Sequence, residues 1–193
     1  GFLLLTKQNI RLDKRNLFGL FILGAVFNTG QSSTYFYSLN FIPASLAVLI
    51  SYTYPAFTAI ISSLWDREPI TKQIAFSLIS CFAGLILMVG LNLGQINVIG
   101  IILATAASIF YAFYVVLTNK MLKKVPPLIA CSYISLFSTV GALSLSLFSS
   151  NHISIGFPGA VWLWMLGLAV CSIATIFFLF KGLKILGPTK ASV

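Results

Sequence analysis

Long apolar runs alternate with short polar gaps along this chain. Each run is roughly 20 residues long, the length that an α-helix needs to cross about 30 Å of hydrocarbon. Backbone groups in lipid must find hydrogen-bond partners within their own segment, so runs of this length indicate helices rather than strands. The pattern predicts six complete membrane-spanning helices, at residues 17–37, 44–64, 74–91, 98–118, 128–148 and 160–180.

Composition strengthens the membrane prediction. The chain is 59% hydrophobic and 8% charged, whereas a soluble domain carries about 25% charged residues. We therefore predict an all-α integral membrane protein whose surroundings are the lipid bilayer. A net charge of +9 would suggest nucleic acid as the partner of a soluble protein. Here the basic residues occur only in the gaps, where they orient helices, and we expect no nucleic-acid partner.

The distribution of basic residues predicts the orientation of the chain. If all six spans cross, the 12 Lys and Arg residues fall on one side of the membrane. They precede the first span and follow the second, fourth and sixth spans. The opposite gaps, at 38–43, 92–97 and 149–159, contain none. Because basic residues accumulate in cytoplasmic loops, we predict a multi-pass protein of the plasma membrane with its Lys- and Arg-bearing gaps in the cytoplasm.

The sequence indicates an internal repeat when it is aligned with itself so that residues 17–37 correspond to residues 161–181. The predicted helix boundaries then coincide, which predicts two partial repeats, at 1–91 and 98–193. The apolar stub Gly1–Leu5 and the helix start at Pro188–Val193 both look cut. By the same offset, we expect roughly 45 residues before Gly1 and roughly 40 after Val193 in the parent protein. Each repeat of that parent would have five helices, and the second repeat would be inverted in the membrane. Inverted repeats are typical of secondary transporters.

Three stretches also resemble a known family: YFYSLNFIPASLAVLISYTYPAFTAIIS from Tyr35, EPIT from Glu68 followed by AGLILMVG from Ala83, and KGLKILGPTKASV from Lys181. In order and spacing they are similar to the EamA family of the drug/metabolite transporter superfamily. The resemblance covers essentially the whole chain. It implies a ten-helix bundle of two inverted five-helix repeats, of which six helices are complete here. It also implies alternating-access transport of small metabolites, often outward, without naming the substrate.

Polar side chains inside the predicted spans are the candidates for a binding site, because a polar group in lipid is costly. Asn28, Gln31 and Tyr35 lie on one stripe of the first span. A serine can bond to its own helix and an amide cannot do so as easily, so we favour a cavity for the two amides and helix packing for the hydroxyls. The deeper tyrosines fit either role. The candidate substrate-binding residues are Asn28, Gln31, Tyr35, Tyr52, Tyr54 and Tyr111.

Three further residues are candidates for movement. Pro55 lies in the middle of the second span, where it removes a backbone hydrogen bond and frees a carbonyl, expected to be that of Ser51. It can serve as a hinge or as a simple packing kink. Glu68 and Lys190 are the candidate gate residues. Instead of gating, Glu68 can form a cytoplasmic ion pair or cap a helix. Lys190 can instead serve only to orient the chain in the membrane.

The predicted spans contain no Asp, Glu, His, Lys or Arg. A bare charge at bilayer depth costs a few kcal/mol or more, so we predict a small-molecule substrate that is neutral or zwitterionic. We expect no cofactor and no metal. A homodimer is a possible assembly. The alternatives to a transporter are an intramembrane enzyme and a helical membrane receptor or scaffold. An enzyme would need an activated nucleophile, and the three cysteines have no histidine within the predicted spans to activate them.

Overall fold

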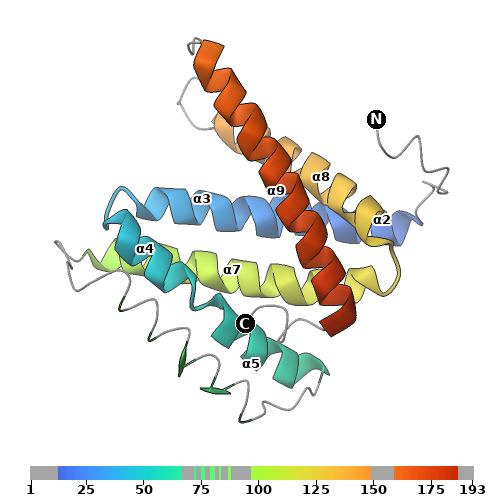
Figure 1. Cartoon of the computed structure of the whole chain (residues 1–193), viewed down its shortest axis with the longest axis horizontal. Coiled ribbons are helices and arrows are strands. Elements are labelled where there is room, and N and C mark those ends of the chain that lie inside the picture. Colours follow the sequence, from blue (N-terminus) through green and yellow to red (C-terminus); the bar gives the residue numbers. More distant parts are fainter. Residues whose placement is uncertain are drawn as a thin grey trace.

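A computed structural model describes residues 13–66, 97–148 and 159–186, with isolated positions between 72 and 87. The described residues form helices and no strand (Figure 1). In chain order the helices are α2 (Lys14–Phe21), the π-helix η1 (Ile22–Asn28), α3 (Thr29–Ser38), α4 (Ala44–Ser51), α5 (Tyr54–Asp66), α7 (Val98–Leu122), α8 (Pro127–Phe148) and α9 (Gly159–Leu186). The all-α prediction is confirmed for the described part of the chain.

Four helical segments of the described residues are long and apolar enough to cross a membrane. They are Ala44–Trp65, Val98–Leu122, Pro127–Leu147 and Val161–Leu186. Each coincides with a predicted span, and the second and fourth extend a few residues beyond the predicted ends. The chain is therefore a multi-pass membrane protein. The predicted span 74–91 lies largely outside the described residues.

The predicted span 17–37 is helical throughout, because α2, η1 and α3 follow one another without a break. It is not among the four apolar segments, since its second half carries the polar stripe that begins at Asn28. The π-helical turn from Ile22 to Asn28 was not predicted from the sequence. Such turns within α-helices occur frequently at functional sites.

Glycines set the close packing between this first helical segment and α7. A Cβ atom added to Gly19 would lie 3.1 Å from the Met121 side chain, and one added to Gly100 would lie 2.6 Å from Ile42 in the turn that follows α3. The start of the first segment therefore lies beside the end of α7, and its end lies beside the start of α7. The two run antiparallel, as Figure 1 shows. Small residues at such contacts let helix backbones approach closely in membranes.

The main apolar core lies where four helical segments meet. Leu20 and Leu23 come from α2 and η1, Val115 from α7, Ile134 from α8 and Phe180 from α9. Only the second half of α9 takes part in this core, and its first half extends away from the bundle (Figure 1). A second cluster around Ala47 and Ala104 fixes α4 against the first half of α7.

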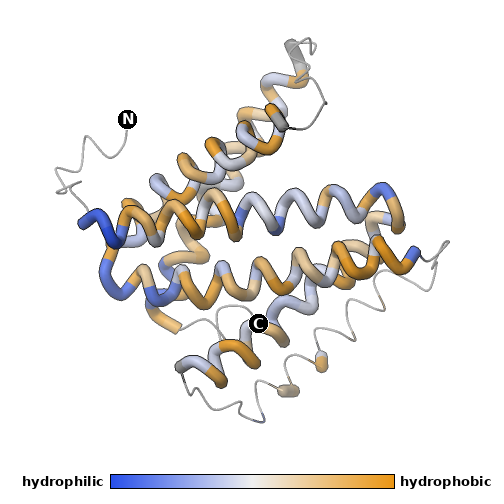
Figure 2. Tube along the Cα trace, turned by 180° about the vertical axis from the view of Figure 1, so that it is seen from behind, coloured by the Kyte–Doolittle hydropathy of each residue, from blue (hydrophilic) through white to orange (hydrophobic). Residues whose placement is uncertain are grey.

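Two strongly hydrophilic segments lie at one end of the bundle. The start of α2 and the turn between α7 and α8 lie at the same end (Figure 2). They contain Lys14, Arg15 and the basic residues from Lys120 to Lys124. These two charged segments are therefore neighbours in space although they lie far apart in the sequence.

Candidate functional site

The helix predicted at 44–64 is broken into two halves. Its first half, α4, ends at Ser51, and its second half, α5, begins at Tyr54. The Thr53 hydroxyl donates a hydrogen bond to the Ile50 carbonyl at 2.7 Å, which closes the end of α4. The Thr53 carbonyl then accepts the backbone N–H groups at the start of α5. A residue at the break is thus bonded to both halves.

Pro55 explains why the break falls here. It is the second residue of α5, and the first turn of a helix is the place where the missing N–H of a proline costs least. A hinge or a packing kink at Pro55 was expected from the sequence. The structure instead interrupts the helix two to three residues earlier, at Tyr52 and Thr53, and begins a new helix around the proline. The hinge role of Pro55 stays a prediction.

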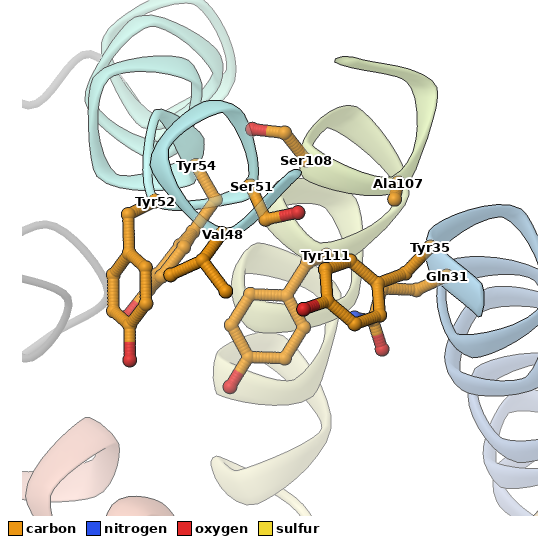
Figure 3. Close-up of a pocket in the computed structure, with 9 residues that line it drawn as sticks. All are labelled: Gln31, Tyr35, Val48, Ser51, Tyr52, Tyr54, Ala107, Ser108 and Tyr111. Atoms are coloured by element: carbon orange, nitrogen blue, oxygen red, sulfur yellow. The ribbon is translucent and has the colours of Figure 1, made fainter. Parts of the chain in front are cut away.

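A pocket of about 450 Å³ lies between α3, the α4–α5 break and α7 (Figure 3). Its volume falls in the range of small-molecule sites. Five of the six candidate substrate-binding residues line it, although they come from three separate segments of the chain. The lining residues are Gln31, Tyr35, Val48, Ser51, Tyr52, Tyr54, Ala107, Ser108 and Tyr111. None of them carries a carboxylate, an imidazole, an ammonium or a guanidinium group.

Tyrosine rings form much of the pocket wall. The rings of Tyr54 and Tyr111 lie perpendicular to one another, with 4.6 Å between their centroids. The ring of Tyr52 lies 6.3 Å from that of Tyr54, and Tyr114 stacks on Tyr111 from behind at 5.7 Å. Perpendicular and offset rings are the favoured arrangements of aromatic pairs. The helix break makes this cluster, because it places two tyrosines opposite the middle of α7.

The hydroxyl groups at the break differ in their bonding. The Ser108 and Thr53 hydroxyls lie 2.8 Å apart and bond α7 to the break. The Ser51 hydroxyl is buried and has no hydrogen-bond partner among the described residues. In Figure 3 it points toward the pocket. A buried hydroxyl without a partner costs free energy, so Ser51 is a group that a ligand could satisfy.

Gln31 contributes an amide from the opposite side of the pocket. Its side-chain oxygen accepts a hydrogen bond from the Ser32 hydroxyl at 3.4 Å. No other hydrogen bond of this side chain to a described residue is observed. Its NH₂ group can therefore donate to a ligand, because a carboxamide nitrogen carries two N–H groups.

Asn28 lies on a different face of the same helical segment. Its NH₂ group donates to the Ser138 hydroxyl of α8 at 2.8 Å. Around it lies a second hollow of about 470 Å³, which it borders together with Thr29, Ser32 and Ser138 among others. The structure therefore does not bring Asn28 to the tyrosine-lined pocket.

Four residues of the pocket lining were not among the candidates predicted from the sequence. Val48 and Ala107 carry no polar signal that could have pointed to it. Ser51 and Ser108 are hydroxyl residues within the predicted spans, and helix packing was the role favoured for such residues. The candidate gate residues Glu68 and Lys190 lie outside the described residues.

Comparison with known proteins gives matches along the chain. The model of the EamA-like transporter family matches residues 1–90 and 98–193. A protein named "Uncharacterized transporter YyaM", from Bacillus subtilis (strain 168), is 24% identical over 93% of this chain and 61% of its own length. A second, named "Uncharacterized transporter in sor 3'region", from Acidianus ambivalens, is 31% identical over 53% of this chain and 40% of its own length. The chain thus spans less than two thirds of either relative.

A solved crystal structure has a similar fold. It matches 98% of this chain with a TM-score of 0.74, and the chain covers 69% of it. The sequence identity is 20%, so the likeness concerns the fold alone.

Proposed function

Because this chain belongs to the EamA-like transporter family, we propose that it acts as a secondary transporter that exports a small neutral or zwitterionic metabolite across the plasma membrane by alternating access. Both curated relatives are named as transporters, which favours transport over an intramembrane enzyme or a receptor. The observation that carries the proposal is the uncharged pocket beside a broken helix. Secondary transporters commonly bind substrate at interrupted membrane helices.

The position of the pocket supports a substrate site deep in the bilayer. α7 has 25 residues and is therefore about 37 Å long, enough to cross the hydrocarbon. Ser108 and Tyr111 lie near its middle, so the pocket would lie near the bilayer midplane, where substrate sites of secondary transporters are found. At that depth a charged substrate would need an opposite charge. The lining offers none, which supports a neutral or zwitterionic substrate.

The helix break supports a moving part. α4 and α5 both pack on α7, yet each is a separate short helix. A change of backbone angles at Tyr52 and Thr53 would let one half tilt while the other stays packed. Hinges of this kind take up large dihedral changes in a few residues at element ends. We propose that Pro55 fixes where the second half restarts, and that the basic end of the bundle faces the cytoplasm.

Uptake into inverted membrane vesicles tests this function. Vesicles containing the full-length protein should accumulate at least one radiolabelled neutral or zwitterionic metabolite, and Tyr111→Leu should abolish most of this uptake because it removes a pocket wall. Tyr37→Leu is the matched control, because Tyr37 is 60% exposed and lies outside the pocket. Uptake that Tyr111→Leu leaves unchanged, or a folded protein that moves none of the solutes, would contradict the proposal.

A further inference from the structure

The pocket has two chemically different ends. In Figure 3, Gln31 and Tyr35 of α3 stand on one side, and Tyr52 and Tyr54 of the helix break stand on the other. Tyr111 lies between them in this view, below the Ser51 hydroxyl. The rings of Tyr52, Tyr54 and Tyr111 therefore make one end rich in aromatic surface, and the donors of Gln31 and Ser51 lie above and beside them.

The aromatic end suits a positively charged group. The Tyr54 and Tyr111 rings are perpendicular, and the Tyr52 ring lies beside them at an angle of 42° to that of Tyr54. Rings in different orientations present π surface to one group from more than one direction. The faces of aromatic rings attract cations, most strongly where water is excluded. None of the described lining residues carries a carboxylate, so ring faces and neutral hydroxyl oxygens are the groups among them that can stabilise a positive charge.

The donor end suits a negatively charged group. The Gln31 NH₂ group bonds to no described residue, and the buried Ser51 hydroxyl has no partner. Amide and hydroxyl donors form strong hydrogen bonds to a carboxylate. An apolar aromatic ligand would leave these donors unpaired in a desolvated pocket, which is unfavourable. A ligand with a positive charge alone would also leave them without an anionic acceptor.

The class of ammonium group follows from the rest of the wall. A primary ammonium donates three hydrogen bonds and needs acceptors for them. An alkylated ammonium carries few N–H groups or none, and its methyl groups suit ring faces and the side chain of Val48. We infer that the pocket selects a zwitterion with an alkylated ammonium group. The ammonium lies against Tyr52, Tyr54 and Tyr111, and the carboxylate lies at Gln31 and Ser51. This inference rests on the proposed function, whose substrate it specifies.

Binding to the full-length protein in lipid nanodiscs tests the inference, with radiolabelled trimethylglycine as the probe. The decisive competitor is 3,3-dimethylbutanoate, which has the same shape and the same carboxylate but carbon in place of the charged nitrogen. We expect it to compete about tenfold more weakly than unlabelled trimethylglycine, because it lacks the cation–π attraction. Glycine, with its primary ammonium, should also compete more weakly.

Variants at the two ends separate the two contributions. Tyr111→Phe keeps the ring and should bind trimethylglycine nearly as the wild type does, whereas Tyr111→Leu should lose about tenfold in affinity. Gln31→Leu should weaken trimethylglycine binding and leave the binding of choline, which lacks the carboxylate, much less affected. Thermal unfolding of each variant and of Tyr37→Leu identifies losses that are due to misfolding.

Each result decides between the inference and the function. Equal competition by 3,3-dimethylbutanoate, equal losses in Tyr111→Phe and Tyr111→Leu, or no saturable binding by the folded protein would overturn the inference. If another solute is transported while trimethylglycine fails to bind, the ligand class is wrong and the proposed function stands. If trimethylglycine binds with the expected pattern while no solute crosses the membrane, the site is correct and the proposed function fails.

Discussion

Two faces of one helical segment, residues 14–38, meet two different neighbours. Toward α8, the polar residues bond to one another across a close contact. Toward α7 and the helix break, they border an open pocket. The faces differ in their polar residues: Ser, Thr and Asn on the first, and Gln and Tyr on the second.

Hydrogen bonds link the two helices on the α8 face. The Gly24 carbonyl accepts from the Ser138 hydroxyl at 3.2 Å and from the Thr29 hydroxyl at 3.0 Å. The Ser138 hydroxyl in turn accepts from Asn28. Around them the backbones are very close, because a Cβ atom on Gly141 would lie 2.7 Å from the Thr29 hydroxyl. Small polar residues that bond across a tight contact are typical of helix packing in membranes.

The pocket, by contrast, leaves the Ser51 hydroxyl and the Gln31 NH₂ group without partners among the described residues. Polarity alone therefore does not distinguish a packing face from a binding face. The state of the hydrogen bonds does: satisfied groups hold helices together, and unsatisfied groups beside a cavity can receive a ligand. Substitutions on the two faces should therefore have different effects.

Replacement of Gly24 by Ala should strongly destabilise the fold. The added Cβ atom would lie 2.6 Å from the Ile134 carbonyl oxygen and 2.8 Å from the Phe137 Cβ atom, and backbone cannot move aside cheaply. We expect a loss of about 1–3 kcal/mol in the free energy of unfolding, the usual cost of overpacking. Thermal unfolding in detergent measures it.

Gly167→Ala on α9 is the matched control. A Cβ atom there meets nothing within 4 Å, and alanine favours helix over glycine by roughly 0.5–1 kcal/mol. Its unfolding midpoint should stay unchanged or rise slightly. Equal losses in both variants would show that the α8 face is not the close contact described above.

The sequence predicted much of this arrangement for physical reasons. Helix positions followed from the length of apolar runs, because bilayer thickness limits that length closely. The pocket tyrosines were found because Tyr52, Tyr54 and Tyr111 are polar groups deep in apolar spans, where each polar group needs a reason.

The sequence could not separate Asn28 from Gln31. Both lie on one stripe, yet residues four apart share a helix face more closely than residues three apart. Asn28 and Ser32, four residues apart, both border the second hollow, whereas Gln31 and Tyr35, also four apart, both line the pocket. The stripe is wide enough to meet two neighbours, and only the positions of α7 and α8 decide which residue meets which. The π-helical turn, like the exact place of the helix break, also depends on tertiary contacts.

Asn28→Leu should weaken the fold and spare the pocket. The variant removes the hydrogen bond to Ser138, for which about 1 kcal/mol is expected within a membrane. Transport per folded molecule should stay close to that of the wild type, because Asn28 does not line the pocket. The double variant with Ser138→Ala measures the coupling, and the two single losses should not add. A loss of transport at unchanged stability would assign Asn28 to the substrate site.

Ser51→Ala and Ser62→Ala should differ only in binding. Both hydroxyls are buried without a hydrogen-bond partner among the described residues, but only Ser51 lines the pocket. A buried hydroxyl without a partner opposes folding, so either replacement should leave the unfolding midpoint unchanged or raise it slightly, by well under about 1 kcal/mol. Ser51→Ala should also weaken trimethylglycine binding several-fold, because it removes a donor to the carboxylate, and Ser62→Ala should not.

Unfolding curves and binding isotherms of the two variants, recorded side by side, measure both quantities. If Ser51→Ala instead destabilises the protein without affecting binding, its hydroxyl serves helix packing, and the contrast between the two faces of the 14–38 segment does not extend to this residue.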